Sequence, residues 1–374
     1  MLRVARYTLA AASITLTLAG CQDAAAPHDA ASLLGTPPSM SSGMESSSLL
    51  IPRTVDPRTT DPDITWAPAS DPQLAFHHIW LDPSARRNGK LLVFMPGTRN
   101  VPASWQHLGS EAARLGYYVI GLMYQNEVEV IGVCTGSPHR DCSGNMRWEI
   151  LDGTDRSTFV NVTPANSIDN RLTKLLVYLD RQFPGEEWSR FLNHGEPKWS
   201  RIVISGQSQG AGEAALIGKL RHVSRVVMFS GPPDARVPEE ADAWVSIGET
   251  PAAKYFALFH DRDRLVAGIR ANLTAFDMER FGAPVQAELG EPPYSGTHIL
   301  FTDLKPTLGY DAPNAPHQST AKDNNTPIGP DDVPLLRDAW RYLLGEHEAD
   351  EELADDHDEQ DQLRVGHGAV STQR

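Results

Sequence analysis

The sequence predicts an α/β domain built on a mostly parallel sheet, and three observations support this. A short apolar run at 201–205 is followed by a G-x-S-x-G pattern at 206–210 and then by a helix-type run at 211–219. Later apolar runs of strand length alternate with loops and helical segments. The part of the chain between its two polar ends, residues 66–345, is long enough for one large domain with a sizeable core.

The G-x-S-x-G pattern predicts a tight turn that carries a nucleophilic serine. Such a turn has room only for small residues two places before and after the serine, and Gly206 and Gly210 provide that room. The strain directs the Ser208 hydroxyl out of the top of the sheet. It also points the backbone N–H of Gln209, at the start of the helix, toward a developing oxyanion. The flanking strand and helix favour the nucleophile over the alternative, a glycine-rich turn with an incidental serine.

A catalytic serine needs a histidine base and a carboxylate that orients it, and the segments after later strands supply the candidates. Apolar runs at 225–230 and 254–259 predict two of these strands. Asp263 lies just past the second run and precedes an apolar helix start, so it is the first choice for the acid. Asp234 follows the earlier strand and is the main competitor. Asp261 is a third candidate, with a solvated loop charge as the alternative interpretation.

Two histidines compete for the role of base. The last predicted strand covers 297–302, and His298 opens it. Five residues at ~3.3 Å each place His298 roughly 16 Å from the C-terminal edge of the sheet, far beyond hydrogen-bond reach. His317 lies in the loop after this strand, on the side where Ser208 is expected, so it is the predicted base and His298 is predicted to be structural. The other histidines considered are expected in loops or at the surface: His77, His78, His107, His139 and His260.

From about residue 70 to residue 345 the chain resembles the α/β-hydrolases. Residues 91–98 resemble the third strand and the oxyanion loop of that family, with a Pro-Gly pair where most members have His-Gly. Residues 263–266 resemble the acid turn of the family. The tight turn around Ser208, called the nucleophile elbow in that family, departs slightly from the family pattern, because Gln207 stands where related hydrolases often have histidine.

This resemblance implies a central sheet with helices on both faces and a triad in the order Ser208, Asp263, His317. It also implies that the oxyanion loop contributes a backbone N–H, that of Thr98, beside the N–H of Gln209. The elbow and the strand after it most resemble a group of poorly characterised bacterial exported hydrolases. That likeness carries over a fold and a triad but no substrate.

Two cysteines, Cys134 and Cys142, lie eight residues apart in a segment rich in Gly, Ser and Pro. For an exported chain the prediction is a disulfide between them. The alternative is a zinc site with His139, which would need a fourth ligand from elsewhere.

These cysteines belong to a long insertion at 125–164, next to the end of a predicted strand. Long ordered loops in such a place are often functional, so the insertion is predicted to shape the mouth of the active site. Arg147 and Trp148 are candidate substrate contacts within it. For Trp148, packing of the loop is an equal alternative.

The N-terminus is predicted to be an export signal. Arg3 and Arg6 precede an apolar run at 7–19, which is too short to span a bilayer because that needs ~20 residues. The Leu-Ala-Gly-Cys sequence at 18–21 looks like the lipobox of bacterial lipoproteins, which implies cleavage before Cys21 and acylation of that cysteine. The alternative is an ordinary signal peptide with a chance cysteine.

The chain is therefore divided into a lipoprotein signal peptide at 1–20, a flexible tether at 21–65, a catalytic domain at 66–345 and an acidic disordered tail at 346–374. The formal net charge of −15 argues against nucleic-acid binding, because there is no basic stripe to neutralise phosphates.

Together these features predict an exported, lipid-anchored serine hydrolase that acts on an ester-like acyl bond of a small-molecule or lipid-like substrate. No cofactor or metal is expected. The sequence does not separate the outer from the cytoplasmic membrane of a bacterial envelope. Two other functions stay open: an acyltransferase with the same triad, and a surface binding lipoprotein that keeps the fold without catalysis.

Overall fold

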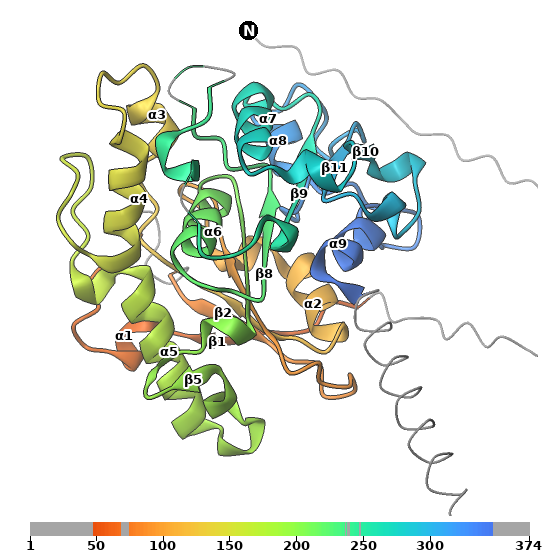
Figure 1. The fold of residues 1–374 in the computed structure, drawn as a ribbon. Helices are drawn as coiled ribbons and strands as arrows, with labels where there is room; N and C mark the ends of the chain where they lie inside the picture. The colour runs from red at the N-terminus through yellow and green to blue at the C-terminus, as the bar shows by residue number, and fades with distance from the viewer. Residues whose placement is uncertain (1–47, 69–74, 236, 238–239, 247, 347–374) are drawn as a thin grey trace, which may run out of the picture. The chain divides into compact units, whose positions relative to one another are not determined.

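The computed structural model describes residues 48–68, 75–235, 237, 240–246 and 248–346. The predicted signal peptide, the lipidation site at Cys21 and all but the first residue of the predicted acidic tail lie outside these residues. In the described part, the centre of the molecule is a nine-stranded sheet with the order β1-β2-β4-β3-β7-β8-β9-β11-β10 (Figure 1). A separate two-stranded ribbon pairs β5 (Leu192–Asn193) with β6 (Glu196–Pro197).

Seven strands of the large sheet pair with one another in parallel. β2 (His77–Trp80) is antiparallel to both of its neighbours, β4 and the edge strand β1 (Arg53–Val55). Because the sheet is covered on both faces, its central strands are nearly continuous apolar runs, as parallel strands usually are. The seven parallel strands are β3 (Leu91–Met95), β4 (Tyr118–Gly121), β7 (Ile202–Gln207), β8 (Arg225–Phe229), β9 (Tyr255–His260), β10 (Val285–Gln286) and β11 (Ile299–Thr302).

Successive residues of each central strand enter the cores on opposite faces of the sheet. In β3, Leu91, Val93 and Met95 belong to one core, whereas Leu92 and Phe94 belong to the other. The first core is completed by the longer helices α4 (Cys142–Asp152), α5 (Ile168–Gln182), α6 (Gln209–Leu220) and α7 (Val266–Ala275). The second is completed by α2 (Gln106–Arg114) and α9 (Arg337–Leu344), which lie together in Figure 1. The sequence therefore gives a mixed α/β fold with a mostly parallel central sheet.

The parallel register brings the C-terminal ends of the central strands to one edge of the sheet. Met95 of β3 pairs with Gly206 of β7, and Gln207 pairs with Phe229 of β8. Thr302, the last residue of β11, pairs with the last residue of β9. The loops that follow these strands, with the short helix α8 (Ala315–Gln318), therefore meet above the same edge.

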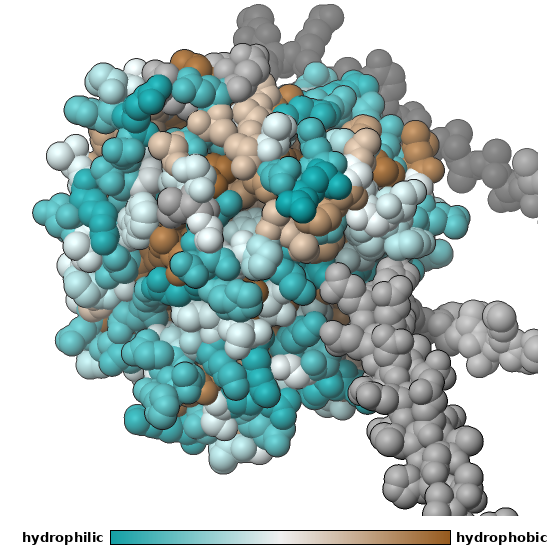
Figure 2. All heavy atoms as spheres, in the orientation of Figure 1, coloured by the Kyte–Doolittle hydropathy of each residue, from teal (hydrophilic) through white to brown (hydrophobic). Residues whose placement is uncertain are grey.

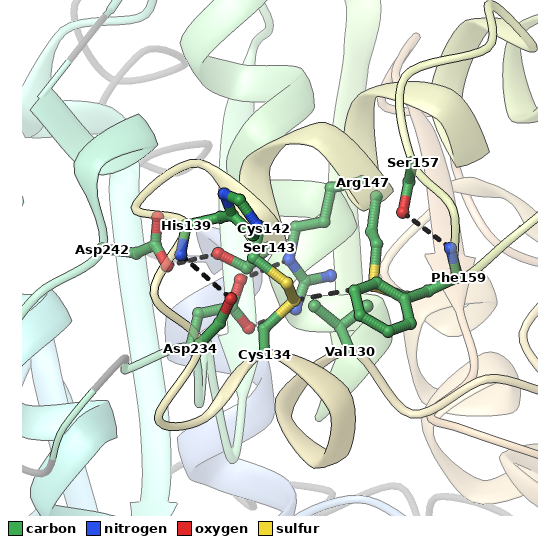
Figure 3. Close-up of a disulfide and its surroundings, with 12 residues drawn as sticks. Val130, Cys134, His139, Cys142, Ser143, Arg147, Ser157, Phe159, Asp234 and Asp242 are labelled. Carbon is green, nitrogen blue, oxygen red and sulfur yellow. Dashed lines mark hydrogen bonds and ion pairs between the residues drawn. A yellow bond between two sulfur atoms is a disulfide. The ribbon is translucent and has the colours of Figure 1, made fainter.

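The predicted insertion at 125–164 is an ordered unit beside this edge. It contains α3 (Val130–Cys134) and α4, joined through the disulfide Cys134–Cys142 with a Cα–Cα distance of 5.6 Å (Figure 3). The disulfide prediction is confirmed. Because both sulfurs are used in this bond, the alternative zinc site with His139 is wrong. Closing a loop this short stabilises a fold by about 2–3 kcal/mol.

The predicted tether, residues 21–65, extends too far along the chain. Arg53–Val55 is the edge strand β1, and Pro57–Thr60 forms the short helix α1. Arg53 pairs with Glu186 at 2.7 Å, and Ile64 is 1% exposed. A three-residue strand is too short to show a periodicity, so these tertiary contacts were not visible in the composition of the segment.

Candidate active site

Ser208 occupies a turn between β7 and α6 that only tightly packed glycines permit. Its backbone has φ 58° and ψ −119°, which a residue with a side chain rarely adopts. A Cβ on Gly206 would overlap the backbone of Gly210, and a Cβ on Gly210 would overlap the carbonyl of Met95. The turn thus exists because two positions lack a side chain, and it holds Ser208, partly exposed, at the C-terminal end of the sheet.

The strained turn is anchored by backbone hydrogen bonds on both sides. The N–H of Ser208 donates to the carbonyl of Phe229 at 2.9 Å. The Ser208 carbonyl accepts from Ala211 at 3.0 Å and Gly212 at 3.2 Å, inside the first turn of α6. Because the C=O and N–H of a trans peptide point in opposite directions, the N–H of Gln209 points away from the helix.

Asp263 and His317 form a buried pair at the same edge. Asp263 directly follows the turn after β9, and its Oδ2 lies 2.5 Å from His317 Nδ1. Its Oδ1 accepts from the N–H of Leu265 at 2.9 Å, so both carboxylate oxygens have a partner. The Asp263 side chain is fully buried and that of His317 is 9% exposed. This pairing orients the imidazole and leaves its Nε2 for another partner.

The histidine segment is tied to the serine turn by Gln207. Its side-chain Nε2 donates to the backbone carbonyl of His317 at 2.9 Å, and Gln207 directly precedes Ser208. Gln207 therefore links these two parts of the chain. Ser208, Asp263 and His317 come from three different strand-end segments that meet at one edge of the sheet.

The competing candidates have other partners. Asp234 is fully buried against Arg147, which binds both of its carboxylate oxygens. Asp261 is half exposed and pairs with Arg270 at 2.8 Å. His298 precedes β11, at the opposite end of that strand from Thr302, and its ring stacks at 4.1 Å on both Phe256 and Phe281.

Several histidines expected in loops or at the surface are instead buried. His77 is fully buried in β2, where its Nδ1 accepts from the N–H of Met123 at 3.0 Å. His260 is the last residue of β9 and is also fully buried, with its Nε2 3.0 Å from the carbonyl of Leu304. Burial lowers the pKa of both imidazoles, so they are neutral structural groups at neutral pH.

The predicted oxyanion loop lies against the serine turn. A Cβ added to Gly97 would lie 3.2 Å from the Cβ of Ser208 and 2.7 Å from Gln207 Oε1. Thr98 Oγ1 donates to Gln209 Oε1 at 2.7 Å, which joins the loop to the first residue of α6. The two residues predicted to supply oxyanion donors are therefore in direct contact through their side chains.

Asn126, which the sequence did not single out, holds the predicted oxyanion loop in place. It is 2% exposed, and its Nδ2 donates to the carbonyls of Gly97 and Asn100, each at 2.9 Å. Its own carbonyl accepts from the N–H of Arg99 at 3.0 Å. The loop after β4 brings this amide to Gly97 and Asn100, and no local sequence pattern predicts such a long-range contact.

The prediction that Arg147 contacts substrate is wrong. Its side chain is 0% exposed, and Figure 3 shows it beside the disulfide. It donates to the carbonyl of Gln209 at 2.9 Å and to Glu213 Oε1 at 2.8 Å, besides Asp234. A Cβ on Gly212 would overlap the guanidinium, so this glycine makes the space for it. Trp148 is partly buried and packs against the core, as its alternative interpretation expected.

The buried cluster of Arg147, Asp234 and Glu213 is electrically neutral when Glu213 is protonated. Burial raises the pKa of Glu213 to about 8, although the Arg147 charge opposes the shift. Burial alone would lower the pKa of Arg147, but Asp234 and Glu213 raise it overall, so the guanidinium stays charged. One cation and one carboxylate then balance, which avoids the cost of an unpaired buried charge.

Tyr124, which is near this cluster, is hydrogen-bonded to the predicted oxyanion loop. Its hydroxyl donates to the carbonyl of Pro96 at 2.8 Å, and burial raises the pKa of the phenol well above its usual value. The phenol therefore remains a donor at any physiological pH.

No group of three or more metal-type ligands (His, Cys, Asp or Glu) occurs among the residues that the structure describes. Within the same residues, every helix is too short or too polar to cross a bilayer.

The chain has only a distant similarity to known proteins. Its sequence matches no family model, and no curated protein matches it. Among solved structures it is similar to a sugar hydrolase, YeeB, from Lactococcus lactis, with 10% identity and a TM-score of 0.36 over 75% of this chain and 95% of that one. A similarity of this size is too weak to transfer an activity or a substrate.

The neutral state of the buried cluster can be tested by two substitutions of the same kind. Glu213→Gln should lose little stability at pH 7, because it replaces a protonated carboxyl with a neutral group of the same shape. Asp234→Asn should cost about 3–5 kcal/mol, because it leaves the Arg147 charge without its carboxylate. Denaturant unfolding of the two variants measures both values.

The same cluster predicts a pH dependence. Between pH 4.5 and about 8, native Glu213 keeps a proton that the unfolded chain releases, so its contribution to stability falls as pH rises. Wild type should therefore lose stability relative to Glu213→Gln across this range. Parallel stability curves for the two proteins would show that Glu213 is ionised in the fold.

Proposed function

We propose that this chain is a serine hydrolase of the α/β-hydrolase type that cleaves an ester-like acyl bond. The observation that carries the proposal is the buried Asp263–His317 pair at 2.5 Å, joined through Gln207 to the strained turn that presents Ser208. A serine forced to positive φ costs free energy, and such strain is typical of functional sites. The order serine, acid, histidine along the chain also agrees with this type of enzyme.

The arrangement of the sheet supports the same proposal. Ser208 follows a central parallel strand. In the described sheet, β2 lies between β1 and β4 and runs opposite to both. The candidate acid and base follow strands farther along the same sheet. An α/β-hydrolase fold predicts this placement of nucleophile, acid and histidine at one edge.

In the proposed mechanism, Ser208 Oγ attacks the carbonyl carbon of the ester while His317 Nε2 takes the hydroxyl proton. Asp263, bound to Nδ1, holds the imidazole in the required tautomer and stabilises its positive charge. The tetrahedral intermediate expels the alcohol, which receives the proton from His317, and an acyl-serine remains. A water, deprotonated by His317, then attacks the acyl-serine and releases the acid and free Ser208.

Two backbone N–H groups are suited to bind the oxyanion. The Gln209 N–H belongs to a peptide whose carbonyl is held inside α6. The Thr98 N–H belongs to a peptide whose carbonyl, that of Gly97, is held by Asn126. In each case the fixed carbonyl points the N–H of the same peptide the other way. Donors fixed before the reaction stabilise developing charge without reorganisation.

We extend the proposal to an exported enzyme anchored in the envelope through an acylated Cys21. The lipobox-like sequence at 18–21 supports this location. The Cys134–Cys142 disulfide agrees with it, because disulfides persist mainly in oxidising compartments.

Substitution of the serine tests the proposed mechanism. A fluorophosphonate probe should label the purified protein at Ser208, and Ser208→Ala should abolish this label. Hydrolysis of p-nitrophenyl esters should fall by on the order of 10⁴–10⁶-fold, as for the loss of a triad nucleophile. Substantial esterase activity retained by Ser208→Ala would exclude this mechanism.

Asn126→Ala tests the anchoring of the oxyanion loop. We expect kcat to fall by about 10-fold or more with KM little changed, since removing a whole oxyanion donor costs about 10²–10³-fold. Binding of a boronic acid, which mimics the tetrahedral intermediate, should weaken in parallel.

Asn166→Ala is the matched control, because Asn166 is also buried and its side chain accepts from the N–H groups of Thr65 and Trp66. It should lose comparable stability but keep its kcat. Equal effects of the two variants on kcat would reduce Asn126 to a general structural role.

A further inference from the structure

A cavity of about 350 Å³ opens between three segments that follow β4, β8 and β9. The β4 segment contributes Glu129 and Ile131 from the start of the insertion. The β8 segment contributes Pro233 and Ala235, and the β9 segment contributes Arg264, Leu265, Ala267 and Gly268. A volume of this size lies within the range of small-molecule sites, which is about 300–1,000 Å³.

The segments that line the cavity lie on either side of the serine turn in the sheet order. In the sheet order, β7 with Ser208 at its end lies between β4 on one side and β8 and β9 on the other. The segments that form the cavity therefore flank the serine turn. Two hydrogen bonds connect them to the site: the N–H of Val130 donates to Gln209 Oε1 at 3.3 Å, and that of Leu265 donates to Asp263.

Most side chains that line the cavity are apolar, Thr135 adds a hydroxyl, and the charged side chains form one ion pair. Ile131, Ala235 and Leu265 contribute hydrocarbon surface. Glu129 and Arg264 are charged residues that line the cavity. Arg264 Nη2 lies 3.6 Å from Glu129 Oε1, and the side chains of Glu129 and Arg264 are 42% and 58% exposed. Figure 2 shows brown and tan residues on this side of the molecule, between the positions of α3 and α7.

The charges of Glu129 and Arg264 balance each other, so neither is left unpaired for an occupant of the cavity. Arg264 is further held by Asn314, whose Oδ1 accepts from its Nε at 2.9 Å. A charged group placed deeper in the cavity would lose hydration without gaining a partner there, and this costs several kcal/mol. An uncharged hydrocarbon group gains about 0.8 kcal/mol for each buried CH₂.

We propose that this cavity binds the uncharged apolar substituent of the ester, and that the enzyme acts on esters carrying one medium-sized hydrocarbon group. The assignment rests on the proposed serine-hydrolase function. The hydrocarbon group is either the acyl chain or the leaving alcohol, and both share the same chemistry. Because the charges of Glu129 and Arg264 are paired with each other, neither is left to bind an anionic or cationic end on that group.

The test fills the cavity and measures chain-length preference. Ala267→Phe places a large side chain on the wall, at the second residue of α7. Ala275→Phe makes the same change at the exposed end of the same helix and is the matched control. One series of substrates varies the acyl chain from p-nitrophenyl acetate to octanoate, and a second varies the alcohol from ethyl to octyl acetate.

For Ala267→Phe, the ratio of kcat/KM for the octyl-length substrate to that for the shortest one should fall by about 10-fold or more in one of the two series. The series that responds identifies the acyl or the alcohol group as the occupant. Ala275→Phe should keep the wild-type ratio in both series. An unchanged ratio in both series for Ala267→Phe would overturn the assignment.

A charged substrate provides the second arm. If the acyl series responds, the p-nitrophenyl monoester of glutaric acid should be hydrolysed about 10-fold or more slowly than p-nitrophenyl butyrate, because its carboxylate has no partner in the cavity. Equal rates would overturn selection for an uncharged group.

Failure of this assignment is distinguishable from failure of the proposed function. If the probe still labels Ser208 and acetate is still cleaved while both ratios stay unchanged, the cavity assignment is wrong and the hydrolase proposal stands. If wild type shows no label at Ser208, the proposed function itself fails.

Discussion

The close approach of the serine turn to the strand beside it is the constraint on which the rest of the site depends. Gly206, Gly210 and Gly97 lie where a Cβ would meet the backbone or side chain of a neighbouring segment. These contacts allow β7, β3 and α6 to converge, and they hold Ser208 at a positive φ. The strain is local, but the surrounding parallel sheet is buried and rigid enough to maintain it.

Two buried polar systems then position the groups around the serine. Arg147 joins the disulfide-bearing insertion to the carbonyl of Gln209, and Asn126 holds the carbonyl of Gly97. In each system a side chain donates a hydrogen bond to a backbone carbonyl and so fixes the orientation of that peptide. A buried polar group that loses its hydrogen-bond partner costs free energy. The paired groups here therefore favour one geometry, where an apolar contact would tolerate several. The insertion thus supports the site from below as well as bordering the cavity beside it.

Local patterns predicted much of this structure. The elbow, most central strands and the disulfide could be read from short segments because each depends on neighbouring residues. Long-range contacts could not: β1 is three residues long, and Asn126 carries no signal of its own. Arg147 was a candidate substrate contact, and its burial is explained by the space that Gly212 leaves and by the carboxylate of Asp234. The positions of His317 and His298 at opposite ends of β11 could be predicted, because they depend only on the direction of that strand.

The account depends most directly on His317 activating Ser208 with the help of Asp263. The measurement that tests this is the rate at which a fluorophosphonate modifies Ser208 in His317→Ala and in His298→Ala, both shown to be folded by circular dichroism. Loss of the base should slow modification by about 10²-fold or more in His317→Ala, while His298→Ala should react at nearly the wild-type rate. A wild-type rate in His317→Ala, or a collapse confined to His298→Ala, would contradict the account.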